Sequence, residues 1–86
     1  MKELICKIKK DEHGLHMRPA GIICKVAMKY ECSTIIKFEN KEIYAKSLLS
    51  LLASGIRQNE EFLLCINGPD EEEAYNEFKN LFEKEL

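Results

Sequence analysis

The sequence predicts an α+β fold, an open-faced sandwich of one four-stranded antiparallel sheet with three helices on one face, in the order β-α-β-β-α-β-α. Two kinds of segment predict it: short runs with strand-like alternation, and three runs with helical spacing of apolar residues, one of them short. Turn residues separate these runs. The chain has 86 residues, which is room for one hydrophobic core. We therefore expect a single domain over residues 1–86.

The first half of the chain predicts a strand, a loop and a helix. Apolar and polar residues alternate in residues 4–9, which is typical of a strand with one solvent-exposed face. Residues 11–14 interrupt this pattern and predict a loop. Arg18-Pro19 then opens a helix, because proline is tolerated in a first helical turn, where its missing N–H would be unpaired anyway. The buried face of this helix is expected to comprise Ala20, Ile23, Cys24, Ala27 and Tyr30.

The second half predicts three strands and two helices. Residues 32–38 and 42–45 are expected to pair as a hairpin around a turn at 39–41. Ser47 precedes a short leucine-rich helix that stops at Gly55. A fourth strand is expected over 61–66. Asp70 is expected to cap the last helix, where three glutamates in the first turn offset the helix dipole. The buried face of that helix is expected to comprise Ala74, Phe78, Leu81 and Phe82.

Composition and charge exclude several classes of function. A net charge of −2 argues against the clustered positive field that nucleic-acid binding needs. No apolar run approaches the roughly 18 residues of a membrane span, and no signal peptide is evident. The four cysteines form no C-x-x-C pair and only two histidines accompany them, so neither a metal site nor a cofactor is expected. We expect reduced, structural thiols and a cytoplasmic protein.

The stretch from Gly14 to Ala20 has the residues of an anion-accepting site. His16 lies just before the predicted helix, whose first backbone N–H groups are unpaired and favour a phosphate-like anion. Arg18 can add charge-assisted hydrogen bonds to the same oxygens. A histidine is a nucleophile that titrates near neutrality, so it can accept a phosphoryl group. The simpler alternative is a capping histidine beside a surface arginine.

These residues resemble those of a known family. The stretch GLHMRPAG (residues 14–21) resembles the active-site signature of HPr, the histidine-containing phosphocarrier of the phosphoenolpyruvate-dependent sugar phosphotransferase system. Residues 45–49, AKSLL, resemble the second signature of that family, which holds a regulatory serine. Residues 54–56 and 68–74 also follow the family pattern, so the resemblance covers the whole chain.

The resemblance implies a role for each residue of the loop. His16 would be phosphorylated through Nδ1, with the phosphate held by Arg18 and by the helix start at Met17, Pro19 and Ala20. Enzyme I would be the donor, and a histidine of a sugar-specific IIA domain would be the acceptor. The protein would then act as a covalent phosphohistidine intermediate rather than as a stand-alone enzyme.

The resemblance also implies a regulatory and partner-binding surface around Ser47. An HPr kinase/phosphorylase would phosphorylate Ser47, and the added negative charge would weaken transfer from enzyme I and favour a transcription regulator as partner. A plain helix cap is the alternative for Ser47. Leu48, Leu49 and Leu52 are expected to contact partners, because a leucine-rich helix this short has more apolar surface than one core face needs. Leu48 and Leu52 are favoured over Leu51, and a wholly buried helix is the alternative.

Some residues depart from the family pattern. Met17 stands where the family mostly has a small residue, and His13 adds a second imidazole to the loop. Asn40 and Asn59 replace turn residues that are often glycine, and asparagine tolerates a positive φ. The alternative function is therefore a regulatory HPr-like paralogue that acts through Ser47, or one that serves a nitrogen-related phosphotransferase branch.

Two further expectations concern partners. Arg18, Lys25, Lys29 and Lys46 are expected to form a positive rim near the site, which would make transfer between proteins salt-sensitive. A shuttle is expected to be a monomer. An RNA-binding α+β domain would need paired aromatic residues on a central strand, and Phe62 is isolated between acidic and aliphatic neighbours.

Overall fold

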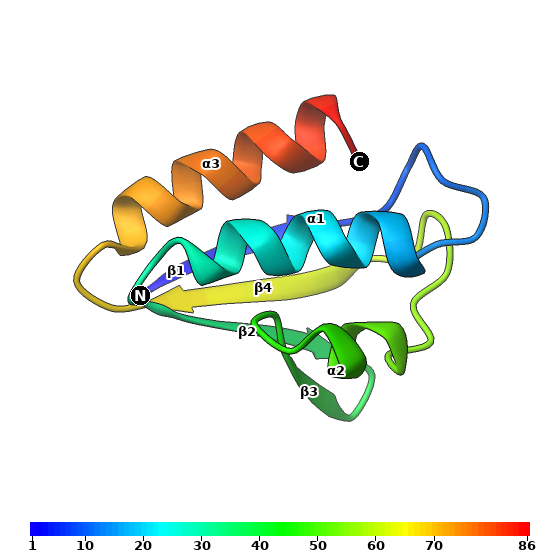
Figure 1. Ribbon diagram of the computed structural model, residues 1–86, viewed down its shortest axis with the longest axis horizontal. Coiled ribbons are helices and arrows are strands. Elements are labelled where there is room, and N and C mark those ends of the chain that lie inside the picture. The colour runs from blue at the N-terminus through cyan, green and yellow to red at the C-terminus, as the bar shows by residue number, and fades with distance from the viewer.

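One antiparallel sheet of four strands, with three helices on one face, makes up the computed structural model, which describes residues 1–86 (Figure 1). The spatial order of the strands is β1-β4-β2-β3, so β4 is central. This arrangement confirms the fold class and the order of elements predicted from the sequence. The elements are β1 (Lys2–Cys6), α1 (Met17–Met28), β2 (Ser33–Phe38), β3 (Lys41–Tyr44), α2 (Leu48–Leu52), β4 (Phe62–Asn67) and α3 (Glu71–Lys84).

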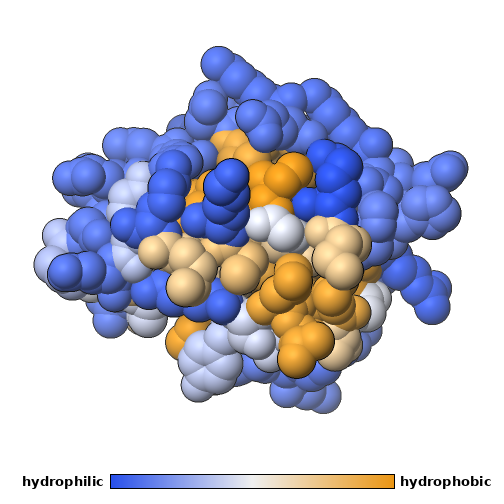
Figure 2. Space-filling view, in the orientation of Figure 1, coloured by the Kyte–Doolittle hydropathy of each residue, from blue (hydrophilic) through white to orange (hydrophobic).

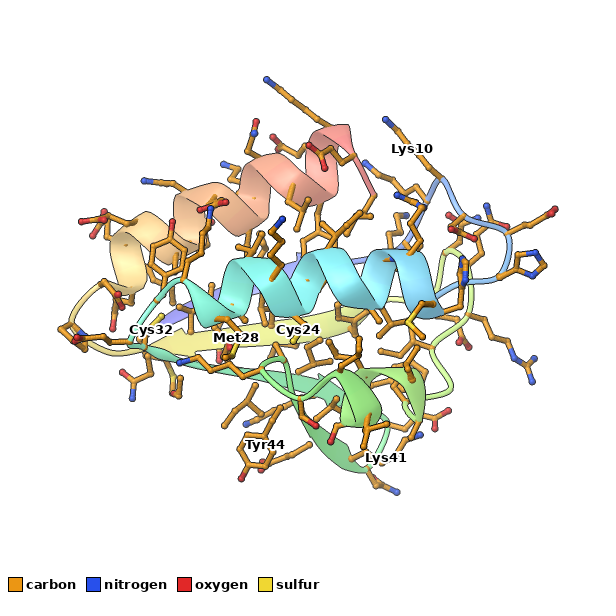
Figure 3. The ribbon with its side chains drawn as sticks, in the orientation of Figure 1. Lys10, Cys24, Met28, Cys32, Lys41 and Tyr44 are labelled. Atoms are coloured by element: carbon orange, nitrogen blue, oxygen red, sulfur yellow. The ribbon has the colours of Figure 1, made fainter.

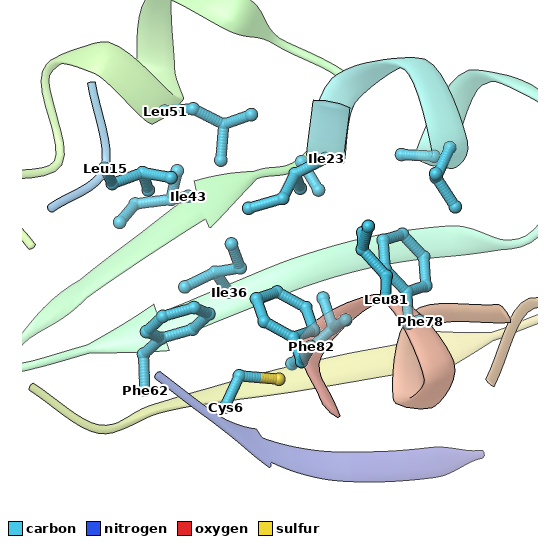
Figure 4. Packing of buried hydrophobic residues seen from close by; sticks show 14 of the residues in the cluster. Cys6, Leu15, Ile23, Ile36, Ile43, Leu51, Phe62, Phe78, Leu81 and Phe82 are labelled. Atoms are coloured by element: carbon cyan, nitrogen blue, oxygen red, sulfur yellow. The ribbon is translucent and has the colours of Figure 1, made fainter. Parts of the chain in front are cut away.

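The core lies between the sheet and the three helices. Leu64 in the centre of β4 pairs with Leu4 of β1 on one side and Ile36 of β2 on the other. Phe62 of β4 and Phe82 of α3 pack edge to face, with ring centroids 5.7 Å apart (Figure 4). Because Phe62 is buried in this core, it is not available to stack on a nucleic-acid base.

The first strand is shorter than its apolar alternation predicts. β1 ends at Cys6, although Ile8 is completely buried. The backbone of this segment pairs with other parts of the chain instead: the Ile8 carbonyl accepts from the Asn59 N–H at 2.9 Å, and the Lys9 N–H donates to the Leu86 carbonyl at 2.6 Å. Lys10 follows beside the C-terminal end of α3, where its ammonium donates to the Lys84 carbonyl (Figure 3). In this segment buried and exposed side chains alternate as in a strand, although the backbone pairs with no neighbouring strand. The sequence alone cannot tell such a segment from a true strand.

One of the two turn asparagines behaves differently from its prediction. In the hairpin between β2 and β3 the positive φ belongs to Glu39, at 56°, and not to Asn40, whereas Asn59 has the positive φ expected of it, at 67°.

Asp70 occupies the N-cap position of α3, as predicted, but makes no capping hydrogen bond. Its carboxylate accepts instead from the N–H groups of Glu31 and Cys32, at 2.8 and 2.9 Å. Asp70 therefore joins the start of α3 to the segment that leads into β2.

All four cysteines are free thiols. Burial raises the pKa of the Cys6 thiol to about 12. Burial, aided by the Asp70 carboxylate, raises the pKa of the Cys32 thiol to about 11. These two thiols therefore stay protonated near neutral pH and act as small apolar side chains. The helices of the structure are too short or too polar to cross a membrane.

Candidate functional site

The loop that carries His16 is held against the segment between α2 and β4. The Leu15 side chain is buried, and its N–H donates to the Ile56 carbonyl at 3.0 Å. Gly14 has φ +66° and packs directly on the backbone of Ile56 and Arg57. Figure 1 shows these two segments together at the end of the molecule where α1 begins. His16 follows in an extended conformation as the N-cap residue of α1.

The first turn of α1 offers two free backbone donors. The N–H groups of Met17 and Arg18 make no hydrogen bond, as is usual for a first helical turn. Pro19 is buried and has no N–H, and the Ala20 N–H already donates to the His16 carbonyl at 2.9 Å. Of the three residues expected to form a phosphate-stabilising helix start, only Met17 therefore presents a free donor, together with Arg18. Pro19 and Ala20 shape the turn.

The carboxylate of Asp11 joins the residues of the loop. One of its oxygens, Oδ2, lies 2.7 Å from His16 Nε2 and 3.4 Å from Arg18 Nε, while Oδ1 accepts from the His13 N–H at 3.1 Å. An ionised carboxylate only accepts hydrogen bonds, so Nε2 must carry the proton in this contact. The lone pair of the neutral ring is then on Nδ1, which makes no hydrogen bond to the helix start. Sequence reasoning placed Asp11 in the loop and gave it no part in the site.

The second imidazole of the loop lies against the first. The ring of His13 meets that of His16 edge to face, with centroids 5.3 Å apart. Its side chain is 71% exposed, compared with 40% for His16, and its Nε2 lies 3.8 Å from the exposed carboxylate of Glu12. His13 is thus a solvated neighbour of His16.

A hydrophobic surface covers α2. Leu49 is 80% exposed and Leu48 and Leu52 are partly buried, while Leu51 is completely buried in the core. In Figure 2 this surface appears as an orange area over α2. Ser47, the N-cap residue of α2, accepts a hydrogen bond from the Ser50 N–H through its hydroxyl, at 3.2 Å. Ser47 therefore caps α2, the alternative given for it, while its regulatory role stays a prediction, and α2 is not wholly buried.

Of the four basic residues expected to form a positive rim, Arg18 lies beside His16, but two of the lysines lie away from the site. Lys29 pairs with Glu77 of α3, and Lys46 donates to the Tyr30 carbonyl at 2.8 Å. Both contacts lie at the C-terminal end of α1, a helix of 12 residues, and so about 18 Å from His16 along its axis. The prediction is wrong for these two lysines because α1 carries Lys29 away from His16, and Lys46 reaches the Tyr30 carbonyl beyond the end of that helix. These two lysines therefore do not support the expectation that transfer between proteins is salt-sensitive.

The pKa of the Asp11 carboxyl is a direct measure of its contact with His16. The hydrogen bond from His16 is the largest of the effects that lower the pKa of Asp11; the His13 N–H and Arg18 add to it, and partial burial opposes it. We expect the pKa of Asp11 to lie below its ordinary value of 3.8. Since the pKa is lower in the folded state, the contact stabilises the fold above the unfolded-state pKa, and this stabilisation is lost as pH falls through the folded-state value.

Carbon NMR of the Asp11 carboxyl tests this prediction. In His16→Ala the midpoint should rise toward the ordinary value, because the main cause of the shift is gone. In His13→Ala the backbone N–H that Asp11 accepts from remains, so the midpoint should stay low. An unchanged midpoint in His16→Ala would contradict the contact.

A histidine with a free ring nitrogen, beside an arginine and a helix start on a small α+β sandwich, defines a site that can accept a phosphate-like group. A family model described as the PTS HPr component phosphorylation site matches residues 7–84. The phosphocarrier protein HPr of Mycoplasma pneumoniae is 38% identical over 76 residues, which are 87% of this chain and 86% of that protein.

Solved structures agree with this match. HPr-C-His from Thermoanaerobacter tengcongensis superposes with a TM-score of 0.88 at 35% identity, covering 96% of this chain and 92% of the other. An HPr dimer from the same bacterium gives a TM-score of 0.74 at 35% identity, covering 96% and 94%. The chain therefore belongs to the HPr family, the phosphocarrier proteins of the phosphotransferase system.

Proposed function

We propose that the protein accepts a phosphoryl group on His16 Nδ1 from a phosphohistidine of enzyme I and passes it to a histidine of IIA domains. The observation that carries this proposal is the Asp11–His16 contact of 2.7 Å, which leaves Nδ1 as the free nucleophile at the start of α1. The family match supports the same reaction.

The transfer needs no chemistry beyond these groups. The Nδ1 lone pair attacks phosphorus, a new N–P bond forms, and the N–P bond of the donor breaks with its electron pair left on the donor nitrogen. The phosphoryl oxygens then lie within reach of the free N–H groups of Met17 and Arg18, and of the Arg18 guanidinium. Donors of this kind hold the phosphoryl group without forming a covalent bond to it, so it can be passed on.

Enzyme I and IIA domains would dock on the hydrophobic surface of α2. Leu49 is 80% exposed, and Leu48 and Leu52, its neighbours in α2, are partly exposed. Met17, at the start of α1, is 61% exposed. Large exposed apolar side chains of this kind commonly mark protein-binding surfaces. A small hydrophobic surface suits partners that must exchange quickly.

The test of the proposed function is a relay between purified proteins. The protein is first phosphorylated with phosphoenolpyruvate and enzyme I, separated from them, and mixed with a IIA domain. The phosphoryl group should leave this protein and appear on IIA. Phosphorylation without onward transfer to any IIA domain would favour the alternative, a regulatory paralogue or a nitrogen-related branch of the system.

Ser47 separates the carrier function from the regulatory one. Its hydroxyl caps α2, so Ser47→Ala should lower the free energy of unfolding by about 1 kcal/mol without changing phosphoryl uptake by His16. Ser47→Asp keeps an N-cap oxygen and adds a charge beside the leucine surface, so it should keep the stability and slow uptake from enzyme I. Urea denaturation and uptake rates measure the two effects. If Ser47→Asp takes up phosphate as fast as Ser47→Ala, regulation through this position is contradicted.

If Ser47 is a regulatory site, an HPr kinase/phosphorylase would phosphorylate it, and a transcription regulator would bind the phosphorylated form. The carrier itself would work in the cytoplasm as a monomer, because a docking surface free of a second copy is needed for exchange between partners. An HPr of similar sequence has been solved as a dimer. Sedimentation before and after phosphorylation tests the point, and a dimer that persists in both states would contradict it.

A further inference from the structure

We propose that Asp11 is a positioning residue for phosphoryl transfer: its carboxylate holds the proton on His16 Nε2, so that Nδ1 is presented as the nucleophile and the ring charge that develops during transfer is neutralised. The inference rests on the proposed function of His16. It adds a residue to the site that neither the motif around His16 nor the helix start contains.

The geometry shows a carboxylate committed to this contact. The Asp11 side chain is only 12% exposed, while the carboxylate of its neighbour Glu12 is 82% exposed. The 2.7 Å separation from Nε2 is the short distance of a charge-assisted hydrogen bond. The Oδ1 atom accepts from the His13 N–H, which fixes the orientation of the carboxylate within the loop. The carboxylate is therefore held in place on both sides.

The charge balance of the reaction explains what the carboxylate would do. When a neutral imidazole bonds to phosphorus through Nδ1 and keeps the proton on Nε2, the ring becomes a cation. A carboxylate at Nε2 stabilises that cation, as the aspartate of a Ser-His-Asp triad stabilises its imidazolium. When the phosphoryl group leaves, the electron pair of the N–P bond returns to Nδ1, and the ring is neutral again with its proton still on Nε2. The same contact therefore serves uptake and release.

Arg18 is also held by Asp11 before reaction. Its Nε lies 3.4 Å from the Oδ2 atom that contacts His16, at the long end of hydrogen-bonding distance. A phosphoryl group carries more negative charge than the carboxylate, so the guanidinium can move to it at little cost. Asp11 thus keeps Arg18 close to His16 while no phosphate is present.

Asp11→Asn is the variant that tests the proposal. The amide retains an oxygen that can accept from the His13 N–H, so the loop should keep its shape, but the negative charge at Nε2 is lost. Glu12→Gln is the matched control, since it removes the adjacent carboxylate, which pairs with His13 and makes no hydrogen bond or ion pair with His16. Two quantities are measured in all three proteins: the nitrogen NMR spectrum of the His16 ring, and the rate of phosphoryl uptake from phosphorylated enzyme I.

In the unaltered protein the His16 ring should show a protonated Nε2 whose proton exchanges slowly with water. Asp11→Asn should lose this slow exchange and take up phosphoryl groups on the order of tenfold more slowly, while Glu12→Gln should match the unaltered protein in both measurements. If neither the ring spectrum nor the uptake rate changes in Asp11→Asn, the role of Asp11 is overturned, and the proposed function of His16 is not affected. No uptake by the unaltered protein would overturn the proposed function of His16, and with it the role of Asp11.

Discussion

His16→Ala is expected to abolish phosphoryl uptake from phosphorylated enzyme I while leaving the fold intact. The variant removes Nδ1 of His16, the ring nitrogen that the Asp11 contact leaves free at the N-cap position of α1. The fold should survive, because the His16 side chain is 40% exposed and makes no capping hydrogen bond to the helix. Phosphorus NMR after incubation with phosphoenolpyruvate and enzyme I measures uptake, and thermal unfolding measures the fold.

His13→Ala is the control for that experiment. It removes the other imidazole of the same loop, whose ring centroid lies 5.3 Å from that of His16. We expect it to take up phosphate as the unaltered protein does. If His13→Ala abolished uptake and His16→Ala kept it, the assignment of the two histidines would be reversed.

Gly14→Ala is expected to have the largest effect on stability of the substitutions considered. Its φ of +66° disfavours any side chain, and an added Cβ would lie 2.5 Å from the Ile56 carbonyl oxygen and 2.8 Å from the Arg57 Cα. Both are backbone atoms, so rotation of a side chain cannot relieve the clash. The free energy of unfolding should fall by about 3 kcal/mol. Because His16 lies two residues further on, uptake should also slow.

Gly21→Ala gives the matched comparison. Nothing lies within 4 Å of a Cβ added at Gly21, and the residue lies inside α1. Alanine favours a helix interior over glycine, so this variant should gain about 1 kcal/mol. Urea denaturation of both variants measures the difference. Equal stabilities for Gly14→Ala and Gly21→Ala would show that the loop does not depend on its contact with residues 56–57.

The arrangement of strands and helices was predictable because local patterns decided it. The leucine-rich run after Ser47 and the apolar spacing of α3 each predict an element that the structure contains. The ends of elements were harder, because tertiary contacts determine them. Ile8 keeps the alternation of a strand, yet its backbone pairs with Asn59 rather than with a strand. Asp70 occupies a cap position, yet it binds the segment before β2.

The candidate site shows the same division. His16 and Arg18 were predicted from a short motif, because the start of a helix brings neighbours in sequence together. Asp11 was not predicted, since its approach to His16 depends on a turn through Gly14 that a sequence pattern does not specify. A carboxylate five residues before the histidine, with a glycine between them, is the only signal that the sequence offers. Lys29 was wrongly placed near the site because distance along α1 was not considered, and Lys46 because its ammonium donates to the Tyr30 carbonyl, just beyond the far end of that helix.

The most direct test of the central claim, that His16 is a phosphoryl acceptor, is the intact mass of the protein after incubation with phosphoenolpyruvate and enzyme I, before and after acid treatment. Phosphohistidine is labile in acid and phosphoserine is stable. The account predicts one added phosphoryl group that acid removes. An added group that survives acid, or none at all, would contradict it.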